Sequence, residues 1–196
     1  PSIAVTDKGT ILAVCEGRKN SLKDNGDIDL LLRRSTDNAK TWSKQKVLWD
    51  DGQNTCGNPT LMIDRQTKRI FLFSTWNHGA DTEKHILTKT GKDTRRVYYL
   101  TSDDDGKTWS KPVEITSQAK APHWRWYATG PGVGIQLEKG PKKGRLIVPC
   151  DHSFPEYPPD NKYGAHVIYS DDHGETWKYS DPVQPGLNEN QIVELK

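Results

Sequence analysis

Two acidic residues near the middle of the chain have a spacing that could bind metal. Asp103 and Asp105 precede Gly106, an order found in the centre of calcium-binding loops, where carboxylates coordinate Ca²⁺ and glycine makes a sharp turn. The same alignment puts Thr101 at the first ligand position and Pro112 at the last, and both ligand positions therefore fail. We expect no metal site here, and nothing in the sequence implies a cofactor.

The same residues belong to a longer pattern, Ser-x-Asp-x-Gly-x-Thr-Trp. It is complete at 102–109 and 170–177, and it occurs at 35–42 with Ala39 in place of glycine. Turn chemistry explains every position: Asp accepts backbone hydrogen bonds two or three residues on, Ser closes the turn, Gly allows positive φ, Thr re-enters a strand and Trp packs on a neighbouring sheet. We interpret the copies as hairpin turns, and expect a slightly different turn at Ala39 because alanine is strained at positive φ.

The elements that carry these turns are strands. The copies start 67 and 68 residues apart, which is too long for a helical repeat and fits a small antiparallel sheet. No window has a convincing helical period. The runs rich in β-branched and aromatic residues are 9–15, 29–34, 69–73, 97–100, 145–148 and 167–169. We predict an all-β fold with roughly three four-stranded blades of a propeller, a number too small to close a ring.

Composition narrows the function classes. The net charge is only +2, from 28 basic and 26 acidic residues, so no strong field favours nucleic acid or a membrane surface. No secretion signal and no membrane-spanning apolar run is present in these 196 residues. Cys15, Cys56 and Cys150 have neither zinc-site nor disulfide-framework spacing, and we expect buried thiols.

Three charged residues near predicted strand ends are the first candidates for function. Asp24 lies in the loop 21–27 and Glu189 lies in an Asn-Glu-Asn segment, and each is by itself typical of a solvated turn. Arg18 ends a predicted strand and would point into the funnel of a propeller, where a guanidinium group binds carboxylates.

An ordered series of segments resembles the first half of the exo-α-sialidases (neuraminidases) with Asp-box (BNR) repeats. After the three Asp boxes, the segments that carry the resemblance are Pro1-Ser2-Ile3, Glu16-Gly17-Arg18, Gly57-Asn58-Pro59, the stretch 126–132, and Glu189 followed by 191–194. The resemblance covers residues 1–196. It implies a six-bladed β-propeller of the sialidase type, of which this chain supplies about three blades as the N-terminal half of a catalytic domain.

The family's function would be the removal of terminal sialic acids from glycoconjugates by a retaining glycoside hydrolase. By this resemblance, Asp24 is the acid/base, with Asp27 as the alternative, and Glu189 is the partner of a tyrosine nucleophile. A neutral tyrosine suits this substrate because a carboxylate nucleophile would repel the carboxylate of the sugar.

The resemblance also implies residues that bind the substrate. Arg18 would bind or support the sugar carboxylate, and Asn58 and Glu83 match positions near the ring substituents and the glycerol tail. Asp151 and His152 follow a predicted strand, and we expect them at the rim of the site. Sialylated glycans would be the partners, in a secreted, periplasmic, cell-surface or lysosome-like setting.

Parts of the family's site have no match. Its first arginine of a triad would lie just before Pro1, and its other two arginines and the tyrosine would lie beyond Glu189. We therefore expect this chain alone to be inactive, and to be completed by a second polypeptide or by the rest of a longer chain. The alternative is a non-catalytic Asp-box propeller fragment that binds a glycan or a protein.

Overall fold

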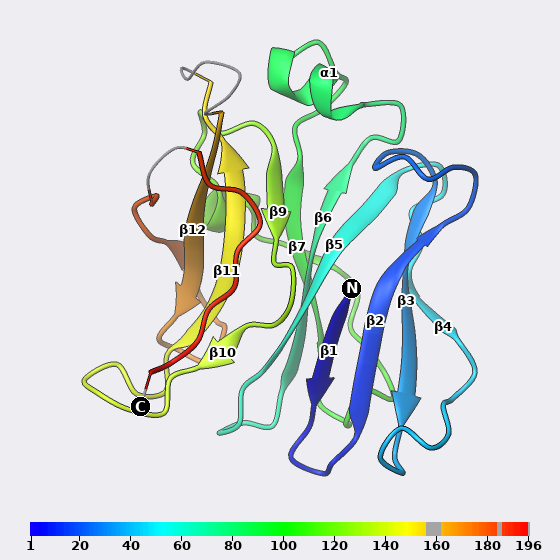
Figure 1. Ribbon diagram of the computed structural model, residues 1–196, viewed down its shortest axis with the longest axis vertical. Helices are drawn as coiled ribbons and strands as arrows, with labels where there is room; N and C mark the ends of the chain where they lie inside the picture. The colour runs from blue at the N-terminus through cyan, green and yellow to red at the C-terminus, as the bar shows by residue number, and fades with distance from the viewer. Residues whose placement is uncertain (156–161, 184–185, 196) are drawn as a thin grey trace.

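The computed structural model of the protein describes residues 1–155, 162–183 and 186–195, and its strands form three successive blades (Figure 1). The first blade comprises β1 (Ser2–Val5), β2 (Ile11–Arg18), β3 (Ile28–Ser35) and β4 (Lys46–Trp49). The second comprises β5 (Thr55–Ile63), β6 (Ile70–Asn77), β7 (Arg96–Ser102) and β8 (Val113–Glu114). The third comprises β9 (Tyr127–Thr129), β10 (Ile135–Gln136), β11 (Leu146–Ser153), β12 (Tyr163–Ser170) and β13 (Lys178–Tyr179).

Strands within each blade pair antiparallel, in chain order. One parallel pair, Ile28 with Thr55, joins the first two blades into an eight-stranded sheet, while the third blade is a separate sheet of five strands. The inner strand of the third blade is divided into β9 and β10, which both pair with β11. The prediction of an all-β propeller fold with about three blades is confirmed.

Each Asp box forms the turn between the third and fourth strands of a blade. Its serine is the last residue of β3, β7 or β12. In every copy the aspartate accepts hydrogen bonds from the backbone N–H and the hydroxyl of the threonine four residues later, at 2.8–2.9 Å and 2.6 Å. The bond therefore spans four residues rather than the two or three that we expected, because the turn is wider than a simple Asx-turn.

The first box is not a different turn, so that prediction was wrong. Ala39 has a φ of 64°, beside 77° at Gly106 and 88° at Gly174, and its N–H donates to Ser35 Oγ at 2.9 Å as in the other copies. Alanine is tolerated because Ala39 is exposed, whereas a Cβ on Gly174 would lie 2.4 Å from Phe71 Cζ. Glycine is needed where a box packs against the preceding blade.

Two apolar clusters lie between successive blades. Leu12, Leu32, Leu61 and Leu72 belong to the cluster between the first and second blades. Phe71, Phe73, Val148 and Trp177 belong to the cluster between the second and third, where the Phe73 and Trp177 ring centroids are 4.9 Å apart. Trp109 packs against the first cluster, whereas Trp42 of the first box is 38% exposed. The box tryptophans thus pack where a preceding blade is present.

Two details of the sequence prediction were wrong. Cys56 and Cys150 are buried, but Cys15 is exposed, because strand alternation turns it away from the face of β2 that buries Leu12 and Val14. Two short helices, α1 (Glu83–Thr88) and α2 (Thr116–Ala119), have six and four residues. They are too short to produce a helical period, and α1 is instead stabilised by a capping box of Thr82 and His85.

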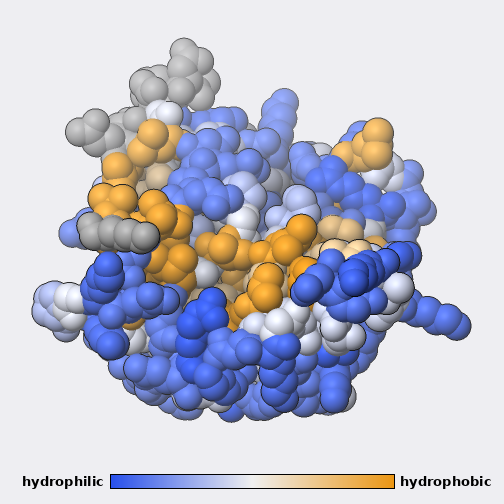
Figure 2. Space-filling view, turned by 60° about the horizontal axis from the view of Figure 1, so that its bottom comes forward, coloured by the Kyte–Doolittle hydropathy of each residue, from blue (hydrophilic) through white to orange (hydrophobic). Residues whose placement is uncertain are grey.

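An apolar band crosses the face turned forward in Figure 2. A groove of about 510 Å³ is lined there by apolar side chains of β1, β5, β10 and the C-terminal segment, including Ile3, Leu61, Ile135, Val193 and Leu195. Within the described residues, no helix has the length and apolar character needed to cross a membrane.

Candidate functional site

The candidate residues gather at the end of the blades opposite the Asp-box turns. The box turns follow the C-terminal ends of β3, β7 and β12, whereas the candidate residues lie at the C-terminal ends of β2 and β11 and near the N-terminal ends of β5 and β7. Since neighbouring strands are antiparallel, these ends meet at one edge of each blade. The antiparallel order therefore brings distant parts of the chain together there.

Asp24 and Arg18 are joined by an ion pair. Arg18 Nη2 lies 2.7 Å from Asp24 Oδ1, and Arg18 Nε and Nη2 also donate to Glu16 Oε2 at 3.0 and 2.8 Å. The Asp24 side chain is nevertheless 76% exposed. One carboxylate oxygen of Asp24 is thus held by Arg18, while the side chain stays open to a ligand.

Asn58 is the junction of the three blades. Its backbone N–H donates to Glu16 Oε1 at 2.8 Å, and its backbone carbonyl accepts from Thr129 Oγ1 at 2.5 Å. Its side-chain oxygen accepts from Thr75 Oγ1 at 2.9 Å and from Arg95 Nη2 at 2.6 Å. These contacts fix Asn58 at a φ of 50°, and Glu16 connects it to Arg18 and Asp24.

Arg95 is a buried cation behind Asn58. It is 2% exposed, and its guanidinium group lies 3.8 Å from the centroid of the Trp126 ring. Burial lowers the pKa of Arg95 to about 10, against the opposing effect of the Glu16 and Asp151 carboxylates, so Arg95 is charged at neutral pH. Its Nε and Nη1 have no hydrogen-bond partner in the described part of the chain.

Asp151 and His152 do not lie at the rim, so that expectation was wrong. β11 continues to Ser153, and the two residues are only 1% and 0% exposed. Burial raises the pKa of Asp151 to about 7; Arg95 opposes this rise and Glu189 adds to it. Asp151 is therefore part of the buried charge around Arg95, and a direct contact with substrate remains a prediction.

Glu189 and Glu83 are placed differently. Glu189 is exposed, in a segment tied to β11 by Asn190 Nδ2, which donates to the Cys150 carbonyl at 2.8 Å. Glu83 begins α1, and its carboxylate lies 3.4 Å from Lys162 Nζ. One contact path, a series of polar contacts through Glu16, thus links Asp24, Arg18 and Asn58. Glu189 acts on Asp151 through its charge, and Glu83 lies outside that path.

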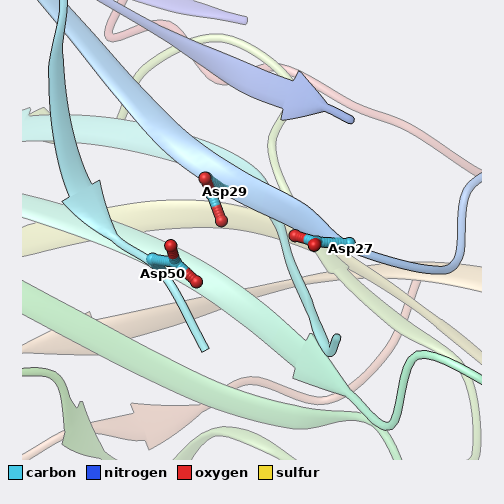
Figure 3. Close-up of side chains that lie close together, drawn as sticks. All are labelled: Asp27, Asp29 and Asp50. Atoms are coloured by element: carbon cyan, nitrogen blue, oxygen red, sulfur yellow. The ribbon is translucent and has the colours of Figure 1, made fainter. Parts of the chain in front are cut away.

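Three aspartates, Asp27, Asp29 and Asp50, converge close to the loop that carries Asp24 (Figure 3). Their carboxylates could coordinate a cation, but Lys19 Nζ lies 2.9, 3.0 and 3.3 Å from them. Hydrogen bonds to Asp27 and Asp29 raise the pKa of Lys19. The ammonium group therefore lies where a cation would bind among the three carboxylates, and Asp27 is turned toward it with a side chain only 10% exposed.

Residues 9–196 match the family model described as a BNR repeat-like domain. The chain belongs to this family. It is 32% identical to a sialidase of Bacteroides fragilis over all of its own length and 37% of that protein, and 34% identical to a sialidase of Micromonospora viridifaciens over all of its length and 30% of that protein. This BNR repeat chain thus spans about a third of the length of these curated relatives, and its predicted resemblance to sialidases is confirmed.

Solved structures agree with the fold of this BNR repeat chain. The Hadza microbial sialidase Hz136 superposes with a TM-score of 0.83 at 29% identity, over 96% of this chain and 38% of that one. The Trypanosoma rangeli sialidase in complex with sialic acid superposes with a TM-score of 0.77 at 18% identity, over 100% and 32% of the two chains, which shows the fold alone.

The sequence analysis of this BNR repeat chain missed two residues of the site. It gave Glu16 no functional role, and it did not mention Arg95. Glu16 precedes Arg18 by two positions, so strand alternation places both on one face of β2, and this period could have revealed it. Arg95 carries no local signal, because its contacts with Asn58 and Trp126 are with residues 37 and 31 positions away.

Proposed function

We propose that the protein carrying this chain is an exo-α-sialidase, which removes terminal sialic acids from glycoproteins, glycolipids and oligosaccharides. The observation that carries the proposal is the contact path from the exposed Asp24 carboxylate through Arg18 and Glu16 to Asn58. It lies at one edge of a sialidase-type propeller in a chain whose relatives are named sialidases.

In this proposal Asp24 is the general acid/base. It gives a proton to the departing oxygen of the glycosidic bond and then takes one from the water that completes hydrolysis. Arg18 keeps one oxygen of the carboxylate in place, so that the other is presented to the substrate. Asp24 suits this role better than Asp27, whose carboxylate is occupied by Lys19.

Further parts of the proposed site follow from the family resemblance. Glu189 serves as partner to a tyrosine nucleophile, which together with the sugar-binding arginines is supplied outside the described blades. The sugar is bound or supported by Arg18, Asn58, Glu83 and Asp151.

The remaining blades come from the same protein or from a second polypeptide. Native mass spectrometry of the active material distinguishes these two cases. We propose a secreted, periplasmic, cell-surface or lysosome-like setting, where sialylated glycans occur; fractionation of the source cells tests it.

The test is Asp24→Ala in the protein with its remaining blades. We expect turnover of an alkyl-linked sialoside to fall by about 10²- to 10⁴-fold, because its leaving group needs a proton, and turnover of an activated aryl sialoside to fall far less. The matched control is Asp27→Ala, which should affect both substrates alike. If Asp27→Ala shows the leaving-group dependence instead, the acid/base role belongs to Asp27.

A further inference from the structure

The side-chain amide of Asn58 is held in one of its two orientations. Arg95 Nη2 approaches one terminal atom of this amide at 2.6 Å, and Thr75 Oγ1 approaches the same atom at 2.9 Å. A guanidinium group can only donate hydrogen bonds, so the atom that faces it must be the amide oxygen. In the flipped orientation two N–H donors would oppose each other.

The backbone of Asn58 is fixed independently of this contact. Its N–H is held by Glu16 on β2 and its carbonyl by Thr129 on β9, so three blades determine where Asn58 stands. What remains for Arg95 and Thr75 to determine is the direction in which the amide points.

With its oxygen turned toward Arg95, the Asn58 amide directs Nδ2 away from the guanidinium group. This nitrogen has no hydrogen-bond partner among residues 1–155, 162–183 and 186–195, and Asn58 is partly exposed. Glu16 connects the same residue to Arg18 and Asp24. The site therefore presents a free amide donor at the inner end of the path that leads to Asp24.

Stability of the fold alone does not explain a buried arginine at position 95. A buried guanidinium group loses its hydration, and here two of its nitrogens gain no partner in the described residues. An apolar side chain of similar length would fill the same space above Trp126 without that loss. The buried charge and its short bond to Asn58 therefore indicate a function in the site.

We propose that Arg95 is a positioning residue that, together with Thr75, orients the Asn58 amide so that Nδ2 donates a hydrogen bond to an acceptor oxygen of the bound sialic acid. The acceptor is a carbonyl or hydroxyl oxygen of a ring substituent. This inference rests on the proposed sialidase function. It assigns to Arg95 a role exerted only through Asn58, with no contact to the substrate.

A double-mutant cycle tests the role. Arg95→Met, Asn58→Ala and their combination are compared in the protein with its remaining blades, and binding of the unsaturated sialic acid analogue 2,3-didehydro-2-deoxy-N-acetylneuraminic acid is measured by calorimetry. Loss of one donated hydrogen bond should weaken binding about tenfold in each single variant. The double variant should be no weaker than Asn58→Ala alone, because Arg95 acts through Asn58.

Two further variants keep the test decisive if Arg95→Met folds poorly. Arg95→Lys retains a cationic donor and should bind within about threefold of the wild type, and Thr75→Val should weaken binding only when Asn58 is present. The melting temperature of each variant is measured in parallel, so that binding is compared only among folded proteins. Additive losses in the cycle, or unchanged binding in Arg95→Met, would overturn the inference.

Different outcomes would contradict the sialidase function and the role of Arg95. If the wild-type protein neither binds the analogue nor cleaves a sialoside, the proposed function itself is wrong. If the wild type does both and the losses are additive, the sialidase proposal stands and only the role of Arg95 falls.

Discussion

The two ends of the blades differ in how completely their charged groups are paired. At the Asp-box end, the first-box aspartate Asp37 accepts from Ser35 Oγ, Thr41 N and Thr41 Oγ1, and the second-box aspartate Asp104 accepts from the equivalent groups. At the other end Arg95 and Asp151 are buried with nitrogen and oxygen atoms that lack a partner in the described residues. Local bonds pair the charges at the repeated end, whereas the site end keeps buried charged groups with unpaired atoms.

The largest effect should come from Gly174→Ala, which breaks the packing at the box end. Gly174 has a φ of 88°, and an added Cβ would lie 2.4 Å from Phe71 Cζ. We expect the free energy of unfolding to fall by about 3 kcal/mol, from backbone strain and overpacking together. Urea denaturation measures the change.

Gly9→Ala is the matched control for this variant. Gly9 has a φ of 79°, but no atom lies within 4 Å of its added Cβ. It should cost only about 1 kcal/mol, because it introduces backbone strain without a clash. Equal losses in the two variants would show that packing against the preceding blade does not make glycine necessary.

The two ends of the blades should lose their contributions to stability at different pH values on acidification. Burial lowers the pKa of His152 to about 3, with added effects of His123 and Lys120, and burial lowers the pKa of His166 well below its ordinary value. Both imidazoles are neutral in the folded protein, so their contribution to stability is present above pH 6.5 and is lost as the pH falls from about 6.5 toward 3, where the unfolded chain takes up protons first.

The box carboxylates titrate later. Hydrogen bonds from Thr41 and Thr108 lower the pKa values of Asp37 and Asp104 to about 2, so their contribution is present above pH 3.8 and is lost only between about 3.8 and 2. Between pH 7 and pH 5 Asp151, whose pKa is raised to about 7, takes up its proton in the folded protein and offsets part of the loss caused by the two histidines. We expect a net fall in the free energy of unfolding on the order of 2 kcal/mol, and a His152→Asn variant to reduce it. A flat profile in the wild type would contradict this order of titration.

The smallest effect should be a gain, from Ala39→Gly in the first box. Ala39 is exposed at a φ of 64°, where glycine is unstrained. Relief of strain exceeds the added entropy of the unfolded chain, so we expect stabilisation of about 0.5 kcal/mol. A rise in melting temperature of one or two degrees would fit this gain. A lower melting temperature would show that the first box differs from the others after all.

Local rules explain what could be predicted at the box end. Serine, aspartate and threonine within one box bond to one another over two to four positions, so the sequence shows the turn directly. Six strands, β2, β3, β6, β7, β11 and β12, follow from β-branched and aromatic composition, whereas β5 was not among the predicted runs. The prediction was wrong where the result depends on which side chains the fold buries. Cys15 is exposed, and β11 extends through His152.

By itself, the sequence determined the three Asp-box turns, six of the strands and the loop that displays Asp24. Only the tertiary structure brought Glu16, Arg95 and Thr129 to Asn58, over separations of 42, 37 and 71 residues. A turn is determined by bonds between near neighbours in the chain, which the residue order contains. The orientation of the Asn58 amide depends on which side chains three packed blades bring against it, and that follows from packing alone.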